Sequence, residues 1–159
     1  MEVRPSTFAD VAALARGMKV VADEGRWIAT EAGTPLEELE RRTRRRLADG
    51  LANLVLVDED EVVGVVDLAP TPFEGVASLG MWVAPSHRGR SGGRMLIDAA
   101  LAARPPDVHK IELEVWPDNE AAIGLYEATG FEREGLRRDH YRRQDGSLRS
   151  SLIMARLFE

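Results

Sequence analysis

The chain contains no cysteine, which excludes disulfide bonds, a cysteine nucleophile and thiolate metal ligands. It also lacks an apolar run long enough to span a bilayer, and its first residues, MEVRPSTFAD, lack the basic-then-apolar pattern of a secretion signal. Basic residues are the minority, 21 against 27 acidic ones, which gives a formal net charge of -6. We therefore expect a cytoplasmic protein with neither a membrane nor nucleic acid as a general partner.

The chain also has no internal repeat, low-complexity tract or linker, so no sequence feature indicates a domain boundary. At 159 residues and 44% hydrophobic content, it is long enough for one core. We expect a single domain spanning residues 1–159.

Hydrophobic periodicity predicts an alternation of strands and helices. The expected elements are a short edge strand at 2–7, helices at 7–23 and 35–48, strands at 53–57, 62–68 and 76–85, a helix ending near 103, a strand at 109–116, a helix at 118–130 and two strands within 131–158. This order combines hairpins with two strand–helix–strand crossovers. It predicts an α/β (α+β) fold, with a central twisted mixed sheet and helices on both of its faces.

Local signals mark several helix ends. Thr34, followed by Pro35 and Glu37, has the pattern of a capping box. Asp118 or Asn119 is expected to cap a later helix, and Gly130 to end it in a left-handed conformation. The arginine run ERRTRRR in the second helix follows glutamates at a spacing of four, which is typical of a solvated face rather than a nucleic-acid site.

A glycine-rich turn, RGRSGGR at residues 88–94, joins an apolar strand to an amphipathic helix. Glycine allows a tight turn that exposes backbone N–H groups, and the helix dipole and the arginines add positive charge. The pattern favours binding of a phosphate-bearing ligand, although an ordinary turn with exposed arginines is the alternative. The spacing fits neither GxxxxGK[ST] nor GxGxxG, so ATP and nicotinamide dinucleotides match poorly.

The turn and a second segment together resemble the GNAT superfamily of N-acetyltransferases. RGRSGGRMLI, after a strand ending in V-x-P, is similar to the acyl-CoA pyrophosphate loop of that superfamily. LEVWPDNEAAIGLYEATGF resembles its second signature, in the right order and at a suitable separation. The resemblance covers roughly Leu79 to Phe131, and the tail is similar to bacterial members that acetylate small amines, amino acids or ribosomal-protein N-termini. It implies a GNAT-like sheet and acetyl-CoA as co-substrate.

The resemblance also implies a set of cofactor-binding residues. They are Met81, Trp82 and Val83, whose strand backbone would hold the pantetheine arm, the turn residues Arg88, Gly89, Arg90, Ser91, Gly92, Gly93 and Arg94, and Asn119 and Tyr126 on the next helix. Ser91 departs from the pattern because it occupies the first motif glycine. Either this position has a positive φ that strains a serine, or Ser91 caps the helix and offers its hydroxyl to a phosphate. The two glycines that follow favour the second alternative.

Acetyl transfer from a thioester to an amine needs an acceptor for the amine proton and a donor for the departing thiolate. Tyr126 is the candidate donor, although its position also suits a core aromatic. Glu114 is the candidate base: strand alternation places it opposite Leu113 and Val115, and it lies twelve residues before Tyr126, as in the ribosomal-protein alanine acetyltransferases that the chain resembles. A solvent-facing carboxylate and a water chain are the alternatives.

Glu31, between the first two helices, is a rival base, because that segment borders the acceptor site in the superfamily. Trp27 in the same segment is a candidate wall of that site or a core residue. The histidines have no metal-like spacing, so we assign no metal.

We therefore expect an acetyl-CoA-dependent N-acetyltransferase for a small primary amine such as an amino acid. The alternatives are a protein N-terminal acetyltransferase and a non-catalytic acyl-CoA-binding module. A homodimer is implied by the resemblance alone.

Overall fold

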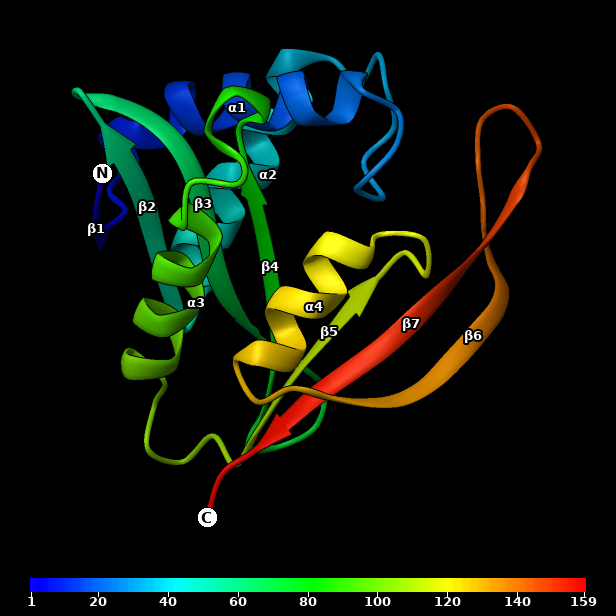
Figure 1. Cartoon of the computed structure of the whole chain (residues 1–159). Helices are drawn as coiled ribbons and strands as arrows, with labels where there is room; N and C mark the ends of the chain where they lie inside the picture. Colours follow the sequence, from blue (N-terminus) through cyan, green and yellow to red (C-terminus); the bar gives the residue numbers. More distant parts are fainter.

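A seven-stranded mixed sheet forms the centre of the computed structural model, which describes residues 1–159 (Figure 1). The elements in chain order are β1 (Glu2–Pro5), a 3₁₀ helix (Phe8–Asp10), α1 (Val11–Asp23), α2 (Leu36–Asp49), β2 (Ala52–Asp58), β3 (Glu61–Pro70), β4 (Val76–Val83), a second 3₁₀ helix (Pro85–His87), α3 (Gly92–Ala102), β5 (Lys110–Val115), α4 (Glu120–Ala128), β6 (Glu132–Arg142) and β7 (Leu148–Leu157). The predicted order of strands and α-helices is confirmed. None of these helices combines the length and apolar character needed to cross a bilayer.

The strands lie in the order β1-β2-β3-β4-β5-β7-β6, and only the β4–β5 pair is parallel. That parallel contact covers just three residue pairs, from Val76–Lys110 to Ser78–Glu112. Beyond them the two strands diverge toward their carboxyl ends, as Figure 1 shows. The divergence leaves the inner edges of β4 and β5 without a strand partner, and this is where the candidate site lies.

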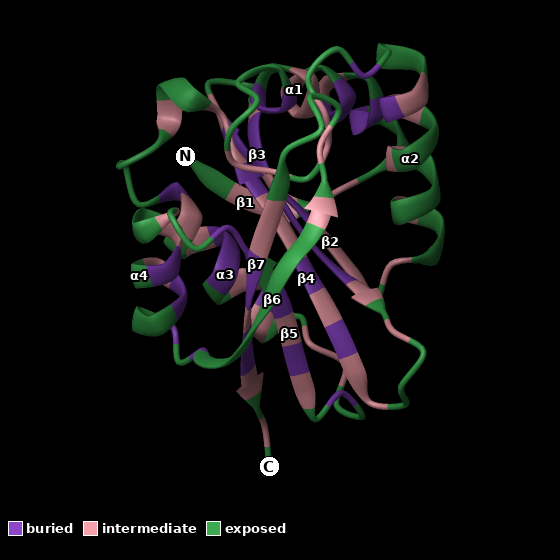
Figure 2. Cartoon of the chain, turned by 90° about the vertical axis from the view of Figure 1, so that its right-hand side faces the viewer, coloured by how far each residue is buried: buried purple, intermediate pink, exposed green.

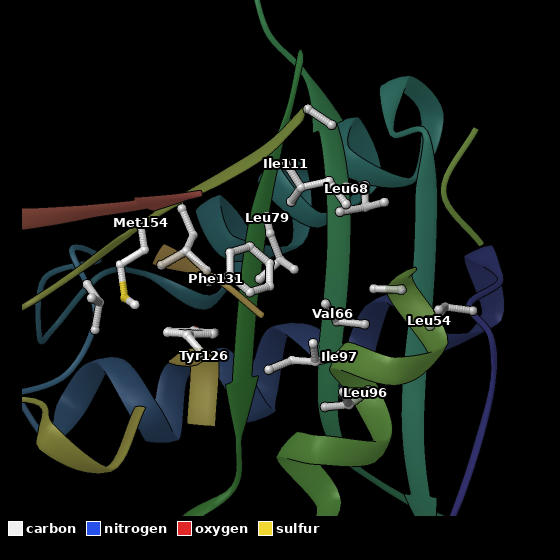
Figure 3. Close-up of a cluster of buried hydrophobic side chains, with 14 of the residues drawn as sticks. Leu54, Val66, Leu68, Leu79, Leu96, Ile97, Ile111, Tyr126, Phe131 and Met154 are labelled. Atoms are coloured by element: carbon white, nitrogen blue, oxygen red, sulfur yellow. The ribbon is translucent and has the colours of Figure 1, made fainter. Parts of the chain in front are cut away.

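Helices cover both faces of the sheet, as predicted. On one face α3 and α4 contribute Leu96, Ile97 and Tyr126 to the main core, which Figure 3 shows together with residues of the strands. On the other face α1 packs Leu14 and Val21 against strand residues of a smaller core. The larger core contains residues from both β4 and β5, so hydrophobic packing holds the diverging strands where hydrogen bonds do not.

The two faces of β5 differ in the way that the sequence predicted. Ile111, Leu113 and Val115 are buried in the main core, whereas Glu112 and Glu114 point to the face covered by α1 and α2. The alternation is visible as stripes of burial along the strand in Figure 2. The candidate base is therefore carried on a strand whose other side is fixed by packing.

The β6–β7 hairpin contains an irregularity with a consequence for the site. Arg137 pairs with Ser151 and Tyr141 with Arg149, so an interval of four residues on β6 faces an interval of two on β7. Asp139, within the bulge, has a left-handed φ of 49°. A regular strand would separate Arg137 and Tyr141 by about 13 Å; the bulge brings both side chains to the same carboxylate, as described below.

The helix ends agree with the sequence at α4 but not at α2. Asn119 caps α4 by accepting a hydrogen bond from the Ala122 N–H at 3.2 Å, and Gly130 has a φ of 88° after that helix. The predicted capping box at Thr34 is wrong. The Thr34 hydroxyl donates to the Glu31 carbonyl at 2.6 Å, and Pro35 precedes α2 without a side-chain cap. Because the Thr34 hydroxyl is used in a hydrogen bond within the α1–α2 loop, it does not cap the helix.

Candidate active site

A cleft of about 1170 Å³ occupies the space between the diverging ends of β4 and β5. It extends from the glycine turn, past the start of α4, to the α1–α2 loop and the β6–β7 hairpin. Of the residues predicted for the site, the structure places these in its wall: Trp27, Met81, Trp82, Val83, Arg88, Gly89, Ser91, Gly93, Arg94, Glu114, Asn119 and Tyr126. Arg90, Gly92 and Glu31 are not among the lining residues.

The glycine turn presents backbone donors at one end of the cleft. Gly89 and Ser91 have φ values of 71° and 67°, and the N–H groups of Gly89, Arg90 and Ser91 make no hydrogen bond to another backbone group. The first N–H groups of α3 are also without intrahelical partners, as at every helix start. This concentration of free donors at a positive helix end is suited to a phosphate group.

Ser91 does not adopt the conformation that the sequence favoured. It directly precedes α3, but its φ is positive and its hydroxyl makes no capping hydrogen bond. The two following glycines cannot take over the left-handed conformation because both already belong to α3. Gly92 is instead required by packing, since a Cβ there would lie 2.6 Å from Cδ2 of the buried Leu56.

The arginines of the turn are engaged with carboxylates of this chain. Arg88 donates to both oxygens of Glu24, at 2.8 and 2.7 Å, and its Nε donates to the Val83 carbonyl at 3.1 Å. The Arg88 guanidinium holds the pKa of Glu24 below its ordinary value. Arg94 pairs with Asp98 on the exposed side of α3. A phosphate bound at the turn would therefore compete with Glu24 for Arg88.

Tyr126 is both a core residue and a residue of the cleft wall. Its ring packs edge-to-face on Phe131, with centroids 5.8 Å apart, and only 8% of the residue is exposed (Figure 3). Burial raises the pKa of its hydroxyl to about 12, because the charged phenolate would be poorly solvated. The hydroxyl therefore stays protonated, as a proton donor requires.

Glu114 is held by two residues that sequence reasoning missed. The Tyr141 hydroxyl donates to one carboxylate oxygen at 2.5 Å, and Arg137 donates to the other at 2.5 Å. Burial, followed by the Glu114 hydrogen bond and charge, raises the pKa of Tyr141 to about 12. The position of these two side chains depends on the bulge in β6, for which the sequence carries no clear signal.

The acceptor candidates in the α1–α2 loop separate in the structure. Trp27 lines the cleft, with the Arg26 guanidinium 4.2 Å from the centre of its ring. Glu31 instead pairs with Arg143 at 3.2 Å and accepts a hydrogen bond from the Gln144 N–H at 3.2 Å. The Glu31 carboxylate thus joins the α1–α2 loop to the β6–β7 hairpin. Glu114 is the better-placed base, because it lines the cleft and Glu31 does not.

Trp116 and Ser151 also belong to the cleft wall and were missed. Both residues are buried, and neither Trp116 Nε1 nor Ser151 Oγ has a hydrogen-bond partner. The alternation along β5 already placed Trp116 on the face of Glu112 and Glu114, so a usable signal was present in the sequence.

The Acetyltransferase (GNAT) family matches residues 21–131, and the chain belongs to this family. Among curated proteins, it is 43% identical over 81 residues to N-alpha-acetyltransferase RimI of Mycobacterium tuberculosis, covering 50% of this chain and 49% of that protein. It is 31% identical over 104 residues to spermidine N(1)-acetyltransferase of Vibrio cholerae, covering 62% of this chain and 60% of that protein. The chain thus aligns with about half to three fifths of these relatives.

A solved structure shows the same fold over the whole length of this chain. YncA from Salmonella typhimurium, determined with its cofactor acetyl-CoA, superposes with a TM-score of 0.86 at 20% identity, covering 100% of this chain and 94% of that one. The predicted GNAT-like mixed sheet is confirmed.

Proposed function

We propose that the protein is an acetyl-CoA-dependent N-acetyltransferase that acetylates the primary amine of a small molecule. The observation that carries the proposal is one continuous cleft. It joins the free N–H groups of the glycine turn to the Tyr126 hydroxyl and the Glu114 carboxylate. Family membership supports the same reaction class, and the solved relative with acetyl-CoA supports the same donor.

The residues present fit acetyl-CoA at the turn end of the cleft. The N–H groups of Gly89 and Ser91 would hold its pyrophosphate, and the unpartnered edge of β4 at Met81 and Val83 would bond its pantetheine arm. Acetyl-CoA supplies an acetyl group activated as a thioester.

The acid and base roles follow from the opposite properties of the two side chains. Glu114 is an anionic carboxylate in the cleft wall and takes a proton from the acceptor ammonium, directly or through a water. The free amine attacks the acetyl carbonyl carbon, a C–N bond forms and the C–S bond breaks. Tyr126, kept protonated by burial, donates its proton to the departing sulfur, and the second proton that the attacking nitrogen loses returns to Tyr126, directly or through water. The products are the N-acetyl amine and the thiol.

The test is release of free thiol from acetyl-CoA in the presence of a panel of amines, amino acids and N-terminal peptides, combined with calorimetric titration of acetyl-CoA. We expect binding, together with thiol release that depends on the acceptor. The absence of binding at millimolar acetyl-CoA would overturn the proposal. Tight binding with no turnover on any acceptor would favour the alternative of a non-catalytic acyl-CoA-binding module.

Acetylation of a protein N-terminus is the second candidate, and the similarity to RimI favours it. The same panel separates the two, because an N-terminal acetyltransferase would prefer peptides over the corresponding free amino acids. The homodimer stays a prediction.

A further inference from the structure

The acceptor end of the cleft contains two buried polar groups without a partner, Trp116 Nε1 and Ser151 Oγ. Buried donors are nearly always hydrogen-bonded, and leaving one unpaired costs about 1–3 kcal/mol. Ser6 Oγ is the only other such side-chain atom, and it lies in the wall of a separate small cavity. Two of the three unpaired groups therefore lie in the wall of the proposed site.

The pairing of β5 with β7 places the two residues that carry these groups at neighbouring backbone positions. Glu114 faces Ile153 and Val115 faces Leu152, so Trp116 and Ser151 are the next residues on either strand. They lie two residues beyond the Glu114–Ile153 pair on the same face of the sheet, at about 6.6 Å along the strand. A small acceptor with its amine at Glu114 is long enough to reach them.

The chemistry of the indole limits what the acceptor can be. Trp116 Nε1 only donates hydrogen bonds, so its partner must carry an acceptor atom. A protonated polyamine has donors alone and would leave this group unpaired. The guanidinium groups of Arg149 and Arg143 lie 4.6 and 5.6 Å from the centre of the same ring. Because Arg149 pairs with Asp118 and Arg143 with Glu31, a bound carboxylate would share these cations with acidic groups of the protein.

Contacts between the β6–β7 hairpin and the α1–α2 loop bridge this end of the site. Arg143 donates to the Ala29 carbonyl at 2.7 Å, and Arg149 donates to the Arg26 carbonyl at 3.0 Å. The Gln144 N–H adds its bond to Glu31. In Figure 1 the hairpin tip and the loop lie on the same side of the molecule. A polypeptide that left the cleft between the loop and the hairpin would have to break these bonds, whereas a single amino acid would not.

We infer that the acceptor is a free α-amino acid, whose carboxylate accepts hydrogen bonds from Trp116 Nε1 and Ser151 Oγ while its amine lies at Glu114. This inference rests on the proposed N-acetyltransferase function and names its substrate class. Because both atoms are buried, the carboxylate must move a side chain of the cleft wall to reach them. The hydrogen bonds gained, which the free protein lacks, offset that movement.

The test compares each of the twenty amino acids with the same compound lacking its carboxylate, for instance leucine with 3-methylbutylamine, and with its amide, a dipeptide and spermidine. Amino acids should exceed their decarboxylated analogues at least 100-fold in kcat/KM, because the analogue leaves buried donors unpaired. Trp116→Phe keeps an aromatic ring but removes the N–H, and should lower kcat/KM for amino acids about tenfold or more, mainly through KM. The loss should be smaller for the decarboxylated amines, which lack the carboxylate that the N–H would bind, and smallest for the Kd of acetyl-CoA.

Ser151→Ala is a second variant with the same expected selectivity and a smaller change in volume. Ser6→Ala is the matched control, since it removes a buried unpaired hydroxyl outside the cleft. The inference is overturned if plain amines or spermidine react as well as amino acids, if dipeptides react better, or if Trp116→Phe affects all acceptors equally.

A binding measurement separates this inference from the reaction itself. The indole N–H resonance of Trp116, assigned by its loss in Trp116→Phe, should shift when an amino acid is added to the protein with CoA. A shift without turnover on any acceptor would keep the amino-acid site but remove the acetyltransferase function. No shift with any amino acid would remove the site.

Discussion

The two halves of the cleft are built in different ways. The half assigned to acetyl-CoA uses backbone groups from short continuous segments, the edge of β4 and the turn at residues 88–94. The acceptor half uses side chains from distant parts of the chain, such as the Arg137 and Tyr141 groups on Glu114. Backbone recognition depends on local conformation, so a motif can encode it. Side-chain recognition depends on tertiary placement, which lets specificity change while the donor site stays the same.

The largest effect on turnover should come from substitution of Tyr126, which lies between the two halves of the cleft. Tyr126→Phe keeps the packing against Phe131 but deletes the proton donor, so kcat should fall about 10- to 1000-fold with little change in the Kd of acetyl-CoA. Wild-type kcat should also show no alkaline loss near pH 10, because burial raises the Tyr126 pKa to about 12 and its donor form is lost only as pH rises through that value. Saturating turnover within twofold of wild type would exclude the acid role.

On the acceptor side, Glu114→Gln should lower kcat/KM about 10- to 100-fold, with the largest loss at low pH. Below the pKa of the acceptor amine most molecules arrive protonated and need the base, whereas at high pH free amine can bind directly. Glu127→Gln is the control, because Glu127 pairs with Arg133 and does not line the cleft. Parallel pH profiles for wild type and Glu114→Gln would assign the base role to water.

On the donor side, Arg88→Ala should weaken acetyl-CoA about tenfold or more, and more at low salt than at high salt. Glu24→Gln separates two explanations of such a result. If a phosphate competes with Glu24 for Arg88, removing the Glu24 charge should leave acetyl-CoA binding equal or tighter. If Arg88 only ties the turn to the end of α1, calorimetry should show both variants weakened alike.

The smallest effect should be seen at Ser91. A non-glycine residue at its φ of 67° is strained by about 1 kcal/mol, so Ser91→Gly should raise Tm by about 2–4 °C. The Kd of acetyl-CoA should change less than threefold, since the backbone donors stay in place. Ser91→Ala should leave Tm unchanged, because the hydroxyl makes no capping bond. A lower Tm in Ser91→Gly would show that the turn is not strained.

The sequence was informative where short-range patterns decide the structure. Strict alternation placed Glu114 opposite Leu113 and Val115, and local spacing narrowed the α4 cap to Asp118 or Asn119, of which Asn119 caps the helix. The sequence prediction failed where a side chain had another hydrogen-bond or ion-pair partner available. Thr34 capped nothing because its hydroxyl bonds within the loop, and the Arg88–Glu24 pair joins residues 64 apart. No periodicity in the chain announces such contacts.

The short parallel contact between β4 and β5 has a mechanical consequence. Only three residue pairs join β4 to β5, so β1–β4 and β5–β7 form two parts of the sheet with few backbone contacts between them. The apolar packing of the main core tolerates small rotations of one part of the sheet against the other better than a hydrogen-bonded ladder would. A ligand that is hydrogen-bonded to the free edge of β4 and reacts beside β5 would then bridge the two parts of the sheet while it is bound. Ligand binding would therefore restrict the motion of the two parts relative to each other, and product release would restore it.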